Sequence, residues 1–442
     1  MAVTTSYAVD IRKNKNIDAA YKATLDLYRC AVSWCIAVVQ EYWDEIQPIK
    51  FSIGRMKHID AHIHITKMHP EPEHDFDTAF PNTPVYFRRA VIMDAIGAYS
   101  SYISNHANWL VSDRKGREPK LGAVRNTYPT FYRGNMYEQD IADDTASLKL
   151  FDGQNWKWYS VKLKHTDMQY LRRHWYRHEK ISAPTLEKHY GTYRLRFACS
   201  AKSELSDTPA EDQKVCAVDL GINTDAACSI MTSDGTVLAR KSINFASEKG
   251  HLYHELNKLK QFQCRHGSHD IAGRWRYIRS LNSQLAYKTA NAIADFAIEQ
   301  ECEVIVFEYL DIKGRKHGSK KQKLAMWKKN AVQDTCASIA HRHGVRIAHI
   351  CAWGTSKLAY DGSGTTERSI DGNYSICRFP NGKIYNCDLS ASYNIGARYF
   401  IRAKEKTMSE SSWSCIKAEV PDAEKRTKCT LSTLWKINAA CA

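Results

Sequence analysis

The sequence predicts a protein of several domains, in which a β-rich section with a helical insertion precedes an α/β domain that has a mixed sheet. Apolar and polar residues alternate with a two-residue period over parts of 4–11 and 147–197, which is typical of strands. Apolar residues near helical spacing over 17–46 and 87–110 predict two long helices between these strand regions. The order of strand, hairpin strand, helices, strand, helix and strand over 215–350 favours the α/β domain.

The first long helix and the segment after it differ in composition. Leu25, Tyr28 and Val32 recur near helical spacing, so their side chains share one face of the helix. The segment that follows, up to about Pro84, is rich in histidine and proline, and we expect it to be a loop.

Turn signals separate the predicted strands. The Asp-Gly pair at 152–153 follows an apolar strand pattern and predicts a β-hairpin. A second Asp-Gly pair, at 234–235, lies between a buried-strand pattern at 215–229 and a return strand at 237–241. The polar residues 203–213 are expected to link the β-rich section to the α/β domain. The other expected elements of that domain are helices over 252–300 and 323–343 and strands over 304–307 and 345–350.

The composition narrows the class of protein. The 442 residues suffice for two to four domains, and 63 Lys and Arg against 48 Asp and Glu give a formal net charge of +15, which favours polyanionic partners. No apolar run of about 18 residues is present, so we expect no membrane partner. The N-terminus lacks the pattern of a secretory signal. The 14 cysteines are scattered singly, which indicates reduced thiols of a cytoplasmic protein.

Three acidic residues at strand ends or element boundaries are the sharpest feature of the sequence. Asp219 lies within an apolar strand pattern, and Glu308 ends another. Asp388 comes just before a helix that we expect to run through Asn394 and Arg398. A buried acid is unfavourable unless it is paired or binds a metal. Each acid alone could be an ordinary strand-end residue, but the set indicates a site that a sheet brings together.

Such a set suits hydrolysis of a phosphodiester bond with two metal ions. Mg²⁺ prefers carboxylate oxygens, and Mn²⁺ accepts the same ligands. Several carboxylates are needed because two divalent ions about 4 Å apart repel each other. The sequence therefore predicts that Asp219, Glu308 and Asp388 are catalytic residues and the ligands of two Mg²⁺ ions, with Mn²⁺ as a substitute.

The segments around these acids resemble the three split RuvC motifs of TnpB-type transposon-encoded RNA-guided nucleases and of compact type V CRISPR effectors of the Cas12 kind. The match is specific over about 214–400, and a weaker likeness to the wedge region of those proteins is visible upstream. The matching segments are Asp-Leu-Gly-Ile-Asn at 219–223, Val-Phe-Glu at 306–308 and Asp-Leu-Ser-Ala-Ser-Tyr-Asn-Ile-Gly at 388–396.

The resemblance implies a multidomain fold. An N-terminal β-barrel wedge would carry an α-helical recognition insertion, and a C-terminal α/β RNase H-like (RuvC) nuclease domain would carry a target-loading insertion. The expected ranges are the first wedge strand at 1–14, the helical recognition domain at 15–127, the wedge β-barrel at 128–205, the first two nuclease motifs at 206–350, the target-loading insertion at 351–384, the third motif at 385–402 and a C-terminal tail at 403–442.

The resemblance also implies an RNA-guided DNA endonuclease. It would hold a guide RNA, bind target double-stranded DNA beside a short flanking motif and cut both strands at one RuvC site. A nucleoid-associated protein of a bacterium or archaeon is expected, and a monomer is favoured over a homodimer. Two alternatives stay open, namely an RNA-guided DNA-binding protein without cleavage and a guide-free RuvC-like nuclease or transposase.

The target-loading insertion departs from relatives that bind zinc there through two Cys-x-x-Cys pairs. Cys377 is retained, but Pro380 stands where its partner cysteine would be, so zinc is not expected. Cys351, Cys387 and His349 could complete an improvised zinc site, which is the alternative.

Basic residues predicted to act on nucleic acid fall into two groups. One lies in the helical stretch after 252, interleaved with Trp275 and Tyr277, and the other follows Glu308. Exposed faces without a ligand are the alternative reading. Arg368 occupies the place of a basic residue near the active site of the relatives, which implies a catalytic role in contacting phosphate. The predicted nucleic-acid-binding residues are Arg274, Arg276, Arg279, Lys313, Arg315, Lys316, Lys320 and Lys321.

A group of histidines precedes the second long helix. His62 and His64 form a His-x-His pair, with His58, His69 and His74 nearby. A metallo-hydrolase would carry such a pair on a barrel strand, but this segment lies in a region of helical character. We therefore expect solvent-exposed or RNA-facing histidines here.

Overall fold

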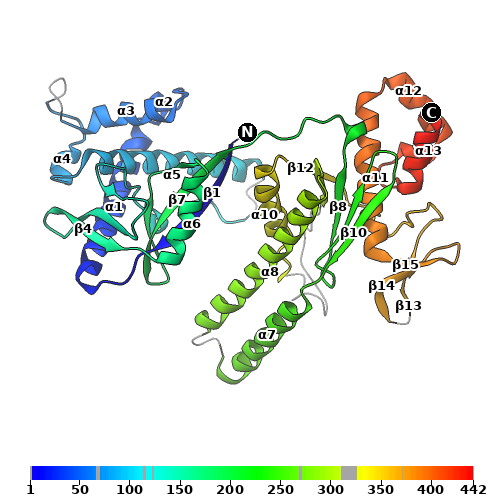
Figure 1. The fold of residues 1–442 in the computed structure, drawn as a ribbon. Coiled ribbons are helices and arrows are strands. Elements are labelled where there is room, and N and C mark those ends of the chain that lie inside the picture. The colour runs from blue at the N-terminus through cyan, green and yellow to red at the C-terminus, as the bar shows by residue number, and fades with distance from the viewer. Residues whose placement is uncertain are drawn as a thin grey trace. The chain divides into compact units, whose positions relative to one another are not determined.

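The computed structural model describes residues 2–65, 70–112, 116–121, 124–267, 271–309, 326–370 and 372–441. Two compact units make up the chain (Figure 1): Thr4–Ala201 is one, and Met1–Val3 with Lys202–Ala442 is the other. No helix among the described residues is both long and apolar enough to cross a membrane.

Two long helices form the helical part of the first unit. Helices α1 (Lys15–Glu41) and α5 (Val85–Val111) pack against each other through buried apolar residues, which confirms both predicted helices. Helix α1 is followed by the short helix α2 (Trp43–Ile46).

The expected loop before Pro84 contains two further helices, so that expectation was wrong. They are α3 (Ser52–Ile63) and α4 (Phe76–Ala79). Met56, Ile59 and Ile63 of α3 are buried, because three apolar residues near helical spacing are enough to dock a short helix on α5. The pattern was not recognised in the sequence because histidines lie between these three apolar residues.

The β-rich section forms two antiparallel sheets. One has the order β1 (Ala2–Asp10), β7 (Thr192–Lys202), β5 (Lys180–Ile181), with β6 (Thr185–His189) also paired to β7; the other has the order β2 (Tyr137–Glu138), β3 (Thr145–Phe151), β4 (Trp156–Lys162). A single bridge joins Ile11 and Leu163, which directly follow β1 and β4, and a second joins Thr185 of β6 to Thr130. Helix α6 (His165–Tyr176) interrupts a stretch that alternation had predicted as strands. The wedge barrel itself stays a prediction.

The second unit contains the mixed sheet that the sequence predicted. Its order is β10 (Val237–Ile243), β9 (Ala226–Met231), β8 (Val215–Leu220), β11 (Val304–Tyr309), β12 (Arg346–Cys351). Strands β10, β9 and β8 pair antiparallel to one another, whereas β11 runs parallel to both β8 and β12.

Helices cover both faces of this sheet. Helices α8 (Ala272–Glu299) and α10 (Lys329–Arg342) pack on the face that carries Cys216, Val218 and Phe307. Helix α11 (Cys387–Thr407) lies along the other face, with α12 (Glu410–Glu419) and α13 (Leu431–Cys441) beside it. All residues of β8 and β9 are buried because both faces are covered.

Helix α11 crosses the sheet closely at Gly396. A Cβ atom added there would lie 2.5 Å from the sulfur of Met231 and 3.2 Å from the Cβ of Ala217. The glycine therefore lets the helix that follows Asp388 approach strands β8 and β9.

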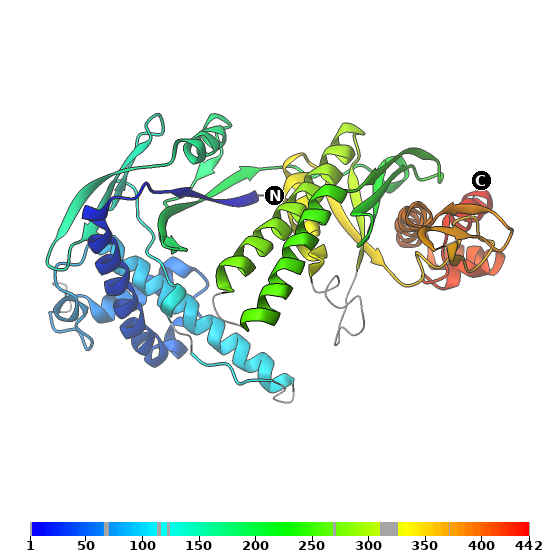
Figure 2. The ribbon, with the colours of Figure 1, turned by 90° about the horizontal axis from the view of Figure 1, so that it is seen from below.

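Two peripheral features complete the second unit. Helix α7 (Ala246–His266) runs beside α8 in both views of the ribbon (Figures 1 and 2), with Leu252, Leu256, Leu259 and Ile278 between them. A small antiparallel sheet of β13 (Glu367–Ile370), β14 (Asn373–Arg378) and β15 (Ile384–Asn386) leads directly into α11.

Short 3₁₀ helices among the described residues lie at Val124–Asn126, Ala210–Asp212 and Pro421–Glu424.

Candidate active site

Asp219 and Glu308 lie at the same end of adjacent strands. Strands β8 and β11 pair in parallel register up to Val218 and Phe307, and the two acids are the next residues. Side chains at matched positions of parallel strands point to the same face. The residues two positions earlier on each strand pack against α11, so both carboxylates belong to the face that α11 covers.

Helix α11 brings the third acid to this face. Asn386 caps the helix, and its Oδ1 accepts hydrogen bonds from the backbone N–H groups of Asp388 (3.0 Å) and Leu389 (2.9 Å). Asp388 therefore lies in the first turn, where the helix dipole favours a carboxylate. Because α11 packs on β8 and β11, the three acids that the sequence singled out come together.

The charge of this cluster is poorly compensated. Burial raises the pKa of Asp219 well above its ordinary value, and the nearby carboxylates of Glu308 and Asp388 raise it further. The Arg368 guanidinium lowers the pKa of Asp219, but it is the smallest of these influences. Within the described ranges, no lysine or arginine forms a salt bridge with any of the three acids.

Glu308 is held in place by polar residues from the loop after β12 and from α11. The hydroxyl of Thr355 donates a hydrogen bond to the Glu308 carboxylate. Asn394, fully buried on α11, donates from Nδ2 to the carbonyl oxygens of Thr355 (3.0 Å) and Leu358 (2.9 Å). Burial raises the pKa of Glu308, whereas the Thr355 hydrogen bond and the charge of Arg398 lower it. The loop therefore helps to keep this buried carboxyl ionised.

Arg398 anchors the same loop from one helical turn further along α11. It is buried, and its guanidinium donates to four backbone carbonyl oxygens at 2.8–3.0 Å. Sequence reasoning placed Asn394 and Arg398 on this helix but gave them no role. Two polar residues four positions apart on an otherwise apolar face were the available signal. The four acceptors belong to Cys351, Trp353, Thr427 and Cys429.

Arg368 lies on the small sheet, and its charge influences Asp219. It is exposed on β13, opposite Cys377 of β14, and its Nη2 donates to the carbonyl of Ser356 at 2.7 Å. Its charge acts on Asp219, so the structure brings all four predicted catalytic residues to one region. Contact with a phosphate stays a prediction.

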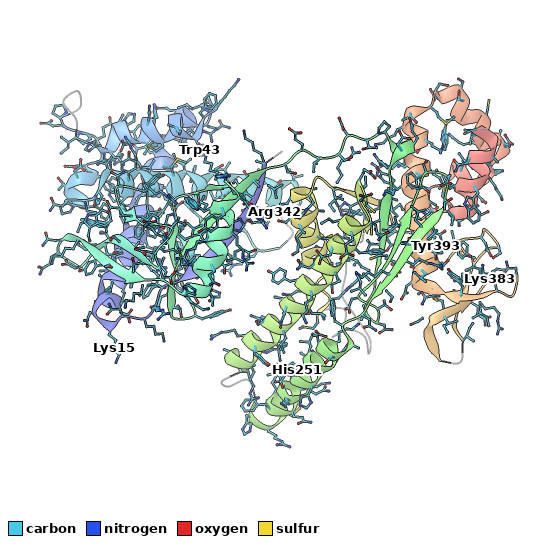
Figure 3. The ribbon with its side chains drawn as sticks, viewed as in Figure 1. Lys15, Trp43, His251, Arg342, Lys383 and Tyr393 are labelled. Atoms are coloured by element: carbon cyan, nitrogen blue, oxygen red, sulfur yellow. The ribbon has the colours of Figure 1, made fainter. Side chains whose placement is uncertain are left out.

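A tyrosine network fastens β15 to strand β10 of the large sheet and to α11. The hydroxyl groups of Tyr385 and Tyr393 are 2.9 Å apart, and Arg240 of β10 donates to them at 3.3 and 3.4 Å. Lys383 donates to the hydroxyl of Tyr360 at 2.6 Å. Figure 3 labels Tyr393, on α11, and Lys383, the residue before β15. These contacts fix the end of β15, which leads directly to Asp388 at the start of α11.

The donor set fits hard divalent cations. The three groups are carboxylates, and the mutual repulsion that raises the pKa of Asp219 would be relieved by a cation. Asp219, Glu308 and Asp388 could therefore hold Mg²⁺ or Mn²⁺.

Gly221, two positions after Asp219, lies close to the backbone of the turn that follows. A Cβ atom added at Gly221 would lie 2.5 Å from the carbonyl oxygen of Thr224. The glycine therefore permits the tight turn between β8 and β9, which ends the strand just beyond the acid.

The three cysteines named for an improvised zinc site, Cys351, Cys377 and Cys387, do not share one environment. All fourteen cysteines of the chain are free thiols. Cys351 is exposed, whereas Cys377 and Cys387 are buried and hydrogen-bonded to each other. Burial raises the pKa of Cys387 to about 12, so its thiol is protonated at neutral pH.

The first group of predicted nucleic-acid-binding residues lies near the start of α8. Arg274, Arg276 and Arg279 are exposed. The Arg274 guanidinium lies 4.4 Å from the centre of the Phe262 ring, and that of Arg279 lies 5.9 Å from the ring of Trp275. The second group lies outside the described residues and stays a prediction: Lys313, Arg315, Lys316, Lys320 and Lys321.

Comparisons with known proteins place this arrangement among relatives. A model of the Aq_aa04 family matches residues 5–152. A TnpB-like protein of Aquifex aeolicus (strain VF5), aq_aa05, is 28% identical over 166 residues, which are 35% of this chain and 53% of that protein. The chain thus matches about half the length of this curated relative.

Solved structures share the fold. The Cas12f1 protein of a complex with sgRNA and target DNA has a TM-score of 0.57 at 13% identity, over 87% of this chain and 83% of that chain. The mini-RNA-guided endonuclease CRISPR-Cas_phi3 has a TM-score of 0.53 at 10% identity, over 89% and 92%. At these identities the likeness shows the multidomain α/β fold. The resemblance predicted from the sequence is confirmed, and the chain is TnpB-like in sequence over part of its length and Cas12-like in fold.

Proposed function

We propose that the chain is an RNA-guided endonuclease that cuts double-stranded DNA beside a short flanking motif at one RuvC-type, Mg²⁺-dependent site. The observation that carries the proposal is the gathering of Asp219, Glu308 and Asp388 at one end of the mixed sheet. The fold supports it, because proteins of the same fold include Cas12f1 in complex with sgRNA and target DNA and an RNA-guided endonuclease.

Each residue of the site would have its own role in cleavage. Asp219, Glu308 and Asp388 would hold Mg²⁺, which when bound supplies positive charge for the phosphodiester and makes water a better nucleophile. Thr355 keeps Glu308 in position and favours its ionised form. Arg368, exposed beside the acids, would contact a phosphate of the strand to be cut.

Nucleic acid would be held by charge and shape, while base pairing with the guide supplies the sequence. The exposed arginines of α8 offer guanidinium groups next to aromatic rings, which suits contact with a sugar–phosphate backbone and with bases. We propose one chain per guide RNA, in a cytoplasmic, nucleoid-associated complex.

The test begins with the chain expressed together with its flanking genomic DNA. Any RNA that copurifies is sequenced, and the complex is given plasmids that carry a matched target behind a randomised flank, with Mg²⁺ present. Asp219→Asn, Glu308→Gln and Asp388→Asn are compared with Glu299→Gln, an exposed acid at the end of α8. Light scattering of the complex gives its subunit number.

We expect a discrete RNA, cleavage beside a restricted flank, loss of cleavage in the three site variants and full cleavage by Glu299→Gln. Target binding without cleavage by the unaltered chain would instead identify a guided DNA-binding protein. Cleavage that needs no RNA would overturn guidance and leave a guide-free nuclease or transposase.

A further inference from the structure

Three potential metal ligands meet between two helices of the first unit. Glu45 lies on α2, whereas His58 and His62 lie four residues apart on α3. One ligand atom of each residue lies within 4.8 Å of the other two, and His58 Nε2 is 2.9 Å from Glu45 Oε2. Residues four apart share a helix face, so both imidazoles face the same carboxylate.

The helices hold these side chains on a fixed frame. Ile46, next to Glu45, is fully buried, as are Ile59 and Ile63, each next to one of the two histidines. Only the side chains of the cluster must therefore adjust around an ion. Figure 3 labels Trp43, the first residue of α2.

Tyr42 supports one of the two imidazoles. Its ring stacks on that of His62 with the centroids 4.2 Å apart, and its hydroxyl donates to the Glu73 carboxylate. Stacking restricts the rotation of the imidazole, which lowers the entropy lost when a ligand atom becomes fixed.

We propose that Glu45, His58 and His62 bind a Zn²⁺ ion, with water as the fourth ligand. Two imidazole nitrogens and one carboxylate oxygen are a donor set that Zn²⁺ accepts in four-coordinate geometry. Imidazole ligands select against Mg²⁺ and Ca²⁺, so this site differs in chemistry from the three carboxylates of the other unit. The ion joins α2 to α3 and stabilises the folded state of the helical part.

The other histidines nearby show that the site depends on the spacing of residues along the helix and not on the number of histidines. His64 is bonded to Asp77 at 2.6 Å, and His74 to Glu41 at 3.0 Å. Each of these is a pair with one carboxylate. The sequence directed attention to the His-x-His pair of His62 and His64, but α3 ends at Ile63 and His64 has an extended backbone beyond it.

The experiment uses the full chain, stripped of metal with a chelator and dialysed. Co²⁺ is added as a spectroscopic probe, and Zn²⁺ binding is followed by displacement of Co²⁺. With Mg²⁺ in excess at the three carboxylates of the other unit, we expect one tetrahedral Co²⁺ ion per chain, with d–d bands and without thiolate charge-transfer bands, and a higher melting temperature with Zn²⁺. Absence of thiolate bands separates this site from binding at the cysteines.

Two variants and one control decide the assignment. Glu45→Gln changes an exposed side chain, and His62→Gln keeps a polar planar group on Tyr42; we expect each to weaken Zn²⁺ binding at least about tenfold. His74→Gln, which removes a histidine paired with Glu41 outside the cluster, should leave the affinity unchanged. Equal Zn²⁺ affinity in the unaltered chain and the three variants would overturn the proposal. If His62→Gln misfolds, the comparison of Glu45→Gln with the unaltered chain still decides it.

Discussion

The hydroxyl of Thr355 donates a hydrogen bond to the carboxylate of Glu308, which lies 47 positions earlier in the chain. Both groups are buried. The bond crosses from the loop after β12 to the end of β11, and it opposes the effect of burial on the pKa of Glu308. The site thus depends on a loop residue as well as on its three acids.

Thr355→Val should raise the pKa of Glu308, because the substitution removes the hydrogen bond that favours the ionised carboxylate. The acid limb of the cleavage pH profile should move to higher pH. The Mg²⁺ concentration for half-maximal cleavage should rise about tenfold, which corresponds to ~1.4 kcal/mol for a hydrogen bond to a charged group. Thr355→Ser keeps the hydroxyl and should behave as the unaltered chain; a defect equal to that of Val would point to packing instead.

Asp219→Asn should stabilise the metal-free protein. Its folded-state pKa is raised above the ordinary value, so the metal-free fold loses stability as pH rises from the ordinary pKa of Asp toward the folded-state pKa. An amide carries no such charge, and we expect a melting temperature higher by ~2–4 °C at neutral pH, as about 1 kcal/mol gives. Thermal melts with chelator measure this.

Asp234 provides the matched control for that melt. A hydrogen bond from Thr232 is the largest cause that lowers the pKa of Asp234, so its charge stabilises the β9–β10 turn. Asp234→Asn should therefore lower the melting temperature, opposite in sign to Asp219→Asn. Mg²⁺ should raise the melting temperature of Asp234→Asn and no longer that of Asp219→Asn. Equal responses of both variants to Mg²⁺ would contradict the assignment of Asp219 as a metal ligand.

Arg398→Met should destabilise the second unit by about 3 kcal/mol or more, since four buried or half-buried carbonyl oxygens lose their donor. Urea unfolding followed by tryptophan fluorescence measures the change. The control is Arg402→Met, an exposed residue one turn later with a single bond to the His349 carbonyl, which should cost under about 1 kcal/mol. Similar losses in both variants would contradict the anchoring role of Arg398.

Replacing Arg274, Arg276 and Arg279 together with Gln should weaken guide RNA binding and lower its dependence on salt. If all three contact phosphates, the slope of log K against log salt should fall by roughly 2, at about 0.7 per contact. Filter binding at several salt concentrations gives the slope. The control is a variant with the same charge change in three exposed lysines of the C-terminal segment, Lys425, Lys428 and Lys436. An equal salt slope in both variants would refute a specific role of α8.

The sequence by itself determined the elements whose signal is local. An apolar run flanked by turn residues defines a buried strand, so β11 and the β9–β10 turn could be predicted. The single buried strand expected over 215–229 is instead two antiparallel strands, β8 and β9. Asp219 and Glu308 stood out because a carboxylate at the end of such a run is unfavourable without a partner. Helix α3 was not predicted, because histidines lie between its three buried apolar residues. Only the packing of the helix decides whether those histidines are exposed.

Only the tertiary structure decided what surrounds the acids. Thr355 carries no local sign of its role, and the spacing of Asn394 and Arg398 does not show their partners. Hydrogen bonds between residues 39 to 47 positions apart depend on how α11 crosses the sheet. The pairing of Glu45 with His58 likewise follows from the angle between two short helices. Local patterns fix which residues form helices and strands, whereas packing of those elements fixes which side chains meet, and the chemistry of both clusters depends on that second step.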